Sequence, residues 1–98
     1  MLNEDVKKSI ETNNMQLLKY TFCDCLDGDP TFKSYEEDYD YCVKHNILFE
    51  AHREINPMTL NNVSEEYWVQ LKNDFLENPS TKRFNHMREV AKILYKDR

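Results

Sequence analysis

The sequence predicts an all-α fold, a compact bundle of four or five short helices that forms a single domain over residues 1–98. Three observations predict this class. The chain is long enough for one core only, since single domains usually span about 100 to 150 residues. Its single glycine, Gly28, leaves little material for the tight turns of β-hairpins, and no alternating strand precedes it. Apolar residues instead recur at the three- and four-residue spacing of helices.

The first helix is expected to begin at Asn3, a residue type that often caps helices. Glu4 and Asp5 follow it, and acidic side chains are favoured near the positive end of the helix dipole. Val6 and Ile10 then start an apolar face.

A second helix is expected after an interruption at Asn13 and Asn14, with Asn13 as its N-cap and Gln16 in the capping-box position. The two segments are either two short helices or one kinked helix. The second segment ends near Gly28, and its apolar stripe consists of Leu17, Leu18, Tyr20, Phe22 and Cys25.

A third helix is expected to begin near Ser34, which has capping-box spacing to Glu37. It should end at Asn46, a residue that readily adopts the left-handed conformation of a helix stop. The spacing predicts that Tyr35 and Tyr39 face the core with Cys42 and Val43, whereas Tyr41 points elsewhere.

Two further helices are expected in the C-terminal third of the chain. Ser64 is a predicted N-cap, Asn78-Pro79 should stop that helix, and Ser80 should cap the next one. The apolar residues of the first are Tyr67, Trp68, Leu71, Phe75 and Leu76, and those of the second are Phe84, Met87, Val90, Ala91, Leu94 and Tyr95.

The sequence argues against an enzyme and against a bound cofactor. Phosphate-binding loops, dinucleotide-binding turns and nucleophile elbows need several glycines, and this chain has one. His52 with Glu54, or His86, could move a proton, but no nucleophile or oxyanion hole accompanies them.

The candidate zinc ligands are Cys23, Cys25, Cys42 and His45, because thiolates and imidazole suit zinc and Cys42 and His45 lie one helical turn apart. Cys23 and Cys25 have only one residue between them, which is too close for the usual paired ligands of a structural site. We therefore predict no metal site and interpret these residues as small buried cysteines and a surface histidine.

The predicted location is the cytoplasm, with no insertion in a membrane. No stretch reaches the roughly 18 apolar residues of a membrane span, and the polar N-terminus lacks the apolar core of a signal peptide. Three cysteines, an odd number, suit reduced thiols better than a set of disulfides.

Charge is distributed unevenly along the chain, whose net charge is −5. From Asp24 to Asp40, seven acids against one lysine leave six net negative charges. From Ser80 to Arg98, six bases against two acids leave four net positive charges. Direct binding of nucleic acid is not expected, because the acidic segment and the overall charge would repel phosphates.

The acidic segment predicts a protein-binding module that docks a basic partner, since dense like charge attracts an opposite surface and an exposed tyrosine can anchor it. The most concrete form is an inhibitor of a nucleic-acid-handling protein such as a nuclease toxin. In size and charge alone the chain is similar to toxin-immunity and anti-defence proteins. The residues predicted to bind the partner are Asp24, Asp27, Asp29, Glu36, Glu37, Asp38, Asp40 and Tyr41.

Two alternatives stay open. The acidic run could simply be a solvated helix face that keeps the protein soluble. The chain could also be a structural or adaptor domain that forms a homodimer through an exposed patch at Ile47, Leu48 and Phe49. The type of that short apolar run is ambiguous, and we expect an anchored connection over residues 47–50 instead of a sheet.

Overall fold

A computed structural model describes residues 2–96, which form five α-helices, one short 3-10 helix and no strand. This confirms the predicted all-α bundle. The helices are α1 (Glu4–Glu11), α2 (Met15–Gly28), α3 (Glu36–Lys44), α4 (Glu65–Glu77) and α5 (Thr81–Leu94), and the 3-10 helix η1 spans Lys33–Tyr35. None of these helices is both long enough and apolar enough to cross a bilayer.

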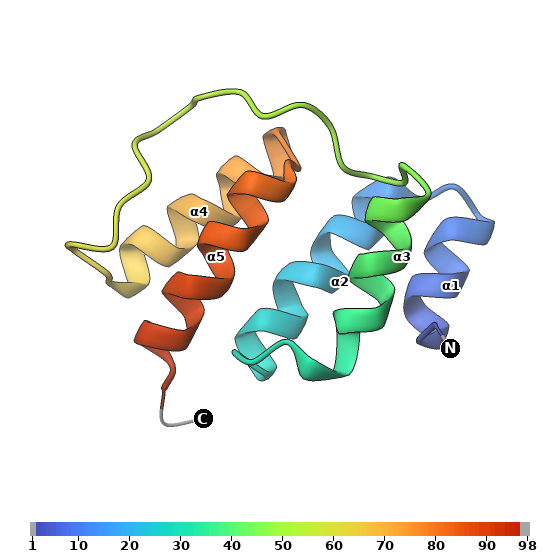
Figure 1. Ribbon diagram of the computed structural model, residues 1–98, viewed down its shortest axis with the longest axis horizontal. Coiled ribbons are helices and arrows are strands. Elements are labelled where there is room, and N and C mark those ends of the chain that lie inside the picture. The colour runs from blue at the N-terminus through green and yellow to red at the C-terminus, as the bar shows by residue number, and fades with distance from the viewer. Residues whose placement is uncertain (1, 97–98) are drawn as a thin grey trace.

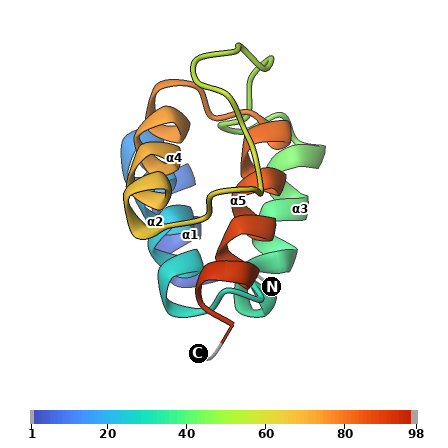
Figure 2. The same cartoon turned by 90° about the vertical axis from the view of Figure 1, so that its left-hand side faces the viewer.

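The helices form two layers. One layer contains α1, α2 and α4, and the other contains α3 and α5 (Figure 2). Helix α2 is central, because it packs against α1, α4 and α5. The segment between α3 and α4 has no helix and arches along one edge of the bundle (Figure 1). The radius of gyration is 12.9 Å, close to the roughly 13 Å of a compact 100-residue domain.

Side-chain caps set three of the helix starts. The side-chain oxygens of Ser64 and Ser80 accept hydrogen bonds from backbone amides at the starts of α4 and α5, as predicted. The prediction that Asn13 caps α2 was wrong by one residue. Asn13 adopts the left-handed conformation (φ 54°) just after α1, so Asn14 is the residue whose side chain reaches the amide of Leu17.

The start of α3 also differs from the prediction. Ser34 makes no capping hydrogen bond, because it lies inside the 3-10 turn η1 and α3 begins only at Glu36. That turn follows Phe32, whose left-handed backbone (φ 60°) brings its ring into the core. Asn46 is left-handed (φ 58°) just beyond the end of α3, as predicted.

An aromatic cluster centred on Phe84 fills the core. The Phe84 ring is fully buried, and its centroid lies 5.1 to 6.3 Å from five other ring centroids. Such distances are typical of favourable tilted and edge-on aromatic pairs. The five rings come from five different parts of the chain and belong to Phe22, Phe32, Tyr39, Phe49 and Phe75.

The expected exposed patch at Ile47, Leu48 and Phe49 does not exist. All three side chains are half-buried and pack against the core, and the Phe49 ring stacks on Phe22 at 6.1 Å. Leu48 has a left-handed backbone (φ 74°), which turns the chain inward here. The run is therefore an anchored connection, as predicted, and its apolar side chains are used mainly in packing against the core.

A buried polar cluster holds the long segment between α3 and α4 against the start of α5. The guanidinium group of Arg83 is fully buried and donates hydrogen bonds to the backbone carbonyls of Arg53 and Asn78. The buried amide of Asn78 donates to the Ala51 carbonyl and to a Glu50 carboxylate oxygen, and accepts from the Arg53 backbone amide. Arg83 is thus a core residue, although its charge alone suggested a surface position.

Two more contacts extend this polar cluster. Asp74, itself buried, accepts two hydrogen bonds of 3.1 Å from the Asn56 side chain and lies 4.0 Å from the Arg83 guanidinium. His52 Nδ1 lies 2.6 Å from the hydroxyl of Ser80, the residue that caps α5. These contacts explain how a segment without helix or strand keeps a defined path, because backbone groups of Glu50, Ala51 and Arg53 are hydrogen-bonded to the helical bundle.

Candidate docking surface

The predicted acidic residues do not gather into one patch, because several of them, including Asp27, Asp29, Glu36 and Asp38, bind groups of the chain itself. The Asp27 carboxylate on α2 accepts hydrogen bonds from the Trp68 indole and from Lys72, both on α4. The Lys72 ammonium is 3.2 Å from the carboxylate and 6.0 Å from the centre of the Trp68 ring. Asp27 therefore ties α2 to α4, and its charge is largely neutralised.

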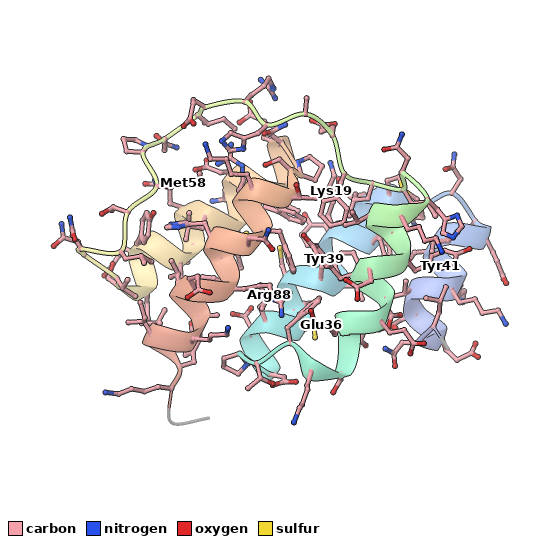
Figure 3. The ribbon with its side chains drawn as sticks, in the orientation of Figure 1. Lys19, Glu36, Tyr39, Tyr41, Met58 and Arg88 are labelled. Atoms are coloured by element: carbon pink, nitrogen blue, oxygen red, sulfur yellow. The ribbon has the colours of Figure 1, made fainter. Side chains whose placement is uncertain are left out.

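Glu36 is neutralised in a similar way. Its two carboxylate oxygens accept hydrogen bonds of 3.1 and 2.6 Å from the two terminal nitrogens of Arg88 on α5. The guanidinium also lies over the rings of Phe32 and Tyr39, at 5.2 and 5.8 Å. Figure 3 shows Glu36, Tyr39 and Arg88 between α3 and α5. Glu36 thus helps to hold α3 against α5.

Asp38 and Asp29 have local structural roles. Asp38 is buried and accepts hydrogen bonds from the backbone amide and the side-chain amide of Asn3, at 2.8 and 3.0 Å. It thereby anchors the start of α1 on α3. Asp29 accepts hydrogen bonds from the hydroxyl and the backbone amide of Thr31. The hydroxyl bond is the main cause that lowers the pKa of Asp29, with backbone amides adding to it.

The remaining predicted residues are exposed, and three of them lie together on α3. Glu37 and Tyr41 are one turn apart on the same side of the helix, and Asp40 adjoins them. The Tyr41 side chain is 38% exposed, and its ring centroid is 4.3 Å from that of His45. Asp24 lies on α2, in the other layer of the bundle (Figure 2).

Tyr41 borders a hollow between α3 and α1. Figure 3 shows Tyr41 on the side of α3 that faces α1, away from the contact between Glu36 and Arg88. The hollow has a volume of about 290 Å³, with an apolar floor that includes Ile10. Its lining residues are Leu2, Glu4, Lys7, Ile10, Glu11 and Tyr41.

Two acidic residues of α1 also border this surface, although the sequence did not predict them as partner-binding residues. Glu4 and Glu11 are seven residues apart, which places both on one side of the helix. That spacing was visible in the sequence, but only the packing of α1 beside α3 shows that they share a surface with Tyr41. We call this surface the α1–α3 face, defined by Glu4, Lys7, Glu11, Glu37, Asp40, Tyr41 and Lys44.

The α1–α3 face is acidic but not uniformly so. Its four carboxylates against two lysines leave two net negative charges around one exposed aromatic ring and a shallow apolar hollow. An aromatic ring surrounded by charged residues is a common arrangement at protein interfaces. A partner could therefore recognise the hollow, the exposed Tyr41 ring and the negative charge of this face.

The candidate zinc ligands lie in surroundings that do not favour zinc binding. Desolvation by burial raises the pKa of Cys23 and of Cys25 to about 12, and that of Cys42 to about 11. These thiols are protonated near neutral pH, whereas zinc binds thiolates. Within residues 2–96, no three side chains of His, Cys, Asp or Glu are grouped so that they could hold a metal ion.

Comparisons of the chain with protein-family models, with curated proteins and with solved structures found no match.

His86 belongs to a hydrogen-bonded chain that fastens the segment before α4. The Thr59 backbone amide donates to the Tyr67 hydroxyl at 2.8 Å, and that hydroxyl lies 2.8 Å from His86 Nε2. Because the hydroxyl oxygen accepts from Thr59, its own proton is available for Nε2 of a neutral imidazole. Desolvation lowers the pKa of His86 below its ordinary value of 6.5, and the nearby Arg83 charge lowers it further.

We expect this arrangement to make stability depend on pH. Because folding lowers the pKa of His86, its contribution is fully present above pH 6.5 and is lost as pH falls through the folded value. Urea unfolding at about pH 7.5 and about pH 5.5 should give the lower free energy of unfolding at acidic pH. The difference should shrink in His86→Gln, which retains an acceptor for the Tyr67 hydroxyl but does not titrate. An equal difference in both proteins would contradict this role.

Proposed function

We propose that the protein is a binding module that docks a basic partner protein on the α1–α3 face. The exposed ring of Tyr41 beside a hollow bordered by Glu4 and Glu11 carries the proposal. A tyrosine buries a large apolar area at a low cost in side-chain entropy, which favours it as an interface anchor. The surrounding carboxylates speed association with a positive surface and disfavour a negative one.

The concrete form that we propose is a cytoplasmic inhibitor, of the toxin-immunity or anti-defence type, that covers the positive groove of a nucleic-acid-handling protein. An acidic protein in that groove blocks nucleic acid by occupying both the space and the charge. Four described bases near the C-terminus are engaged internally: Arg83 is buried, Arg88 is bound to Glu36, and Lys82 and Lys92 lie 3.8 Å from Glu54 and Glu89. This favours a protein partner over direct binding of nucleic acid.

The test starts with affinity capture of the partner from native cells and continues with the purified pair. Association should slow as ionic strength rises. Glu11→Lys should slow it further, because the change reverses a charge at the edge of the hollow. Tyr41→Ala should weaken the complex by about 2 kcal/mol, roughly 30-fold in the dissociation constant, mainly through faster dissociation. Surface plasmon resonance at two salt concentrations measures both rates.

Glu77→Lys is the matched control for Glu11→Lys. Glu11 ends α1 and Glu77 ends α4, both are exposed, and both variants change the net charge by the same amount. If the two variants slowed association equally, the effect would be due to net charge alone, and specific docking on the α1–α3 face would be contradicted. A mobility-shift assay then tests inhibition, and a ternary complex of protein, partner and nucleic acid would overturn the inhibitor form.

A further inference from the structure

A second apolar surface lies over α2 and α4. Its most exposed side chains are Leu17 and Tyr20 on α2 and Val69 on α4, at 42%, 46% and 52% exposure. Between the two helices is a hollow of about 270 Å³. The hollow is lined by Tyr20, Cys23, Asp24, Val69, Lys72, Asn73 and Leu76.

These side chains follow the spacing of a helix-packing face. On α2, Leu17, Tyr20 and Asp24 are separated by three and four residues, and on α4 Val69 and Leu76 are seven residues apart. Helices α2 and α4 pack side by side in one layer (Figure 2). Each helix therefore contributes an outward stripe, and the hollow between them can receive a projecting side chain or a helix. We call this surface the α2–α4 face, defined by Leu17 and the residues that line the hollow.

The charges of the α2–α4 face are balanced, unlike those of the molecule. One acid, Asp24, and one base, Lys72, line the hollow, whereas the chain as a whole carries −5. Next to the hollow, a second acid and a second base keep this balance: Asp27 lies 3.2 Å from Lys72, and the Lys19 ammonium donates to the Leu76 carbonyl. Two copies of an acidic protein repel each other over most of their surfaces, but not at a balanced one.

We infer that the α2–α4 face binds a second copy of this chain. Around a two-fold axis the same face meets itself, so Asp24 of one copy can lie opposite Lys72 of the other. Tyr20 and Val69 of each copy then become buried, and the two α2–α4 pairs stack face to face. The α1–α3 face shares no residue with the α2–α4 face. The dimer therefore does not rest on the proposed function.

Sedimentation equilibrium of the full chain over micromolar to millimolar concentrations tests this inference. The average mass should rise from 11.9 kDa toward twice that value. Val69→Lys should raise the dissociation constant of the dimer at least about tenfold, because it brings two unpaired charges into the contact. Ile93→Lys is the matched control, since Ile93 is 48% exposed on α5 and lies outside the α2–α4 face.

Asp24→Lys tests the charge pairing, because it places lysines of the two copies opposite each other. It should weaken the dimer, whereas Glu77→Lys should not. Circular dichroism would verify that each variant keeps its helices. A wild-type mass that stays at 11.9 kDa throughout, or equal weakening by Val69→Lys and Ile93→Lys, would overturn the inference. Because Val69 is outside the α1–α3 face, Val69→Lys should bind the basic partner normally, so the two proposals fail separately.

Discussion

Replacing Arg83 with methionine should lower the free energy of unfolding by about 3 to 5 kcal/mol, because it removes one member of a buried polar cluster and with it the hydrogen bonds and the charge that it supplies to the others. The carbonyls of Arg53 and Asn78 lose their donors, and the buried Asp74 loses the positive charge 4.0 Å away. Methionine fills much of the same volume, so the loss reflects polar groups left unpaired more than a cavity. Urea unfolding followed by circular dichroism measures the change.

Lys82→Met is the control for this substitution, because Lys82 is the exposed neighbour of Arg83 and should change stability by no more than about 0.5 kcal/mol. The effect should also be local. The amides of Glu50 and Arg53 donate to Pro79 and Asn78, so their hydrogen exchange should accelerate in Arg83→Met before that of the helices. A loss below about 1 kcal/mol would contradict the role of Arg83 in holding this segment.

Phe84→Ala should also cost about 3 to 5 kcal/mol, because it empties the centre of the aromatic core. The Phe84 ring contacts five other rings from α2, α3, α4 and two connecting segments. A shift of any single element would therefore not fill the cavity that the alanine leaves. Such a loss is a large share of the roughly 5 to 15 kcal/mol that stabilises a typical domain.

The control for Phe84→Ala is Ile93→Ala on the same helix, which removes a side chain that is 48% exposed and should change stability little. If Phe84→Ala does not fold, Phe84→Leu keeps most of the volume and should show a smaller loss in the same direction. A loss near that of Ile93→Ala would mean that the core can close over the missing ring, contrary to the packing described above.

The acidic segment shows that a count of charges along the sequence does not reveal which of those charges are neutralised in the folded protein. Seven carboxylates between Asp24 and Asp40 predicted one patch. The sequence did not indicate that Asp27 would meet Trp68, that Glu36 would meet Arg88, or that Asp38 would meet Asn3. These partners are 41, 52 and 35 residues apart along the chain. Each contact depends on how two helices pack, which no local pattern specifies.

Tyr41 is the contrasting case, in which a local pattern was sufficient. Tyr35, Tyr39 and Cys42 share one face of α3, so the helical period alone predicts that Tyr41 points away from that face. The structure confirms a half-exposed ring. What lies beside that ring was not predictable, because Glu4 and Glu11 come from a helix that is 30 or more residues earlier in the chain.

The sequence by itself determined the features that depend on neighbours within about four residues: the helical class, the caps at Ser64 and Ser80, the stop at Asn46 and the apolar face around Phe84. Backbone hydrogen bonds and side-chain periodicity act over that range, so the amino-acid order specifies them directly. Only the tertiary structure decided which charges are neutralised, that Arg83 is buried and that the run after Asn46 belongs to the core. Those outcomes depend on burial and on partners far apart in the chain, which exist only once the helices have packed.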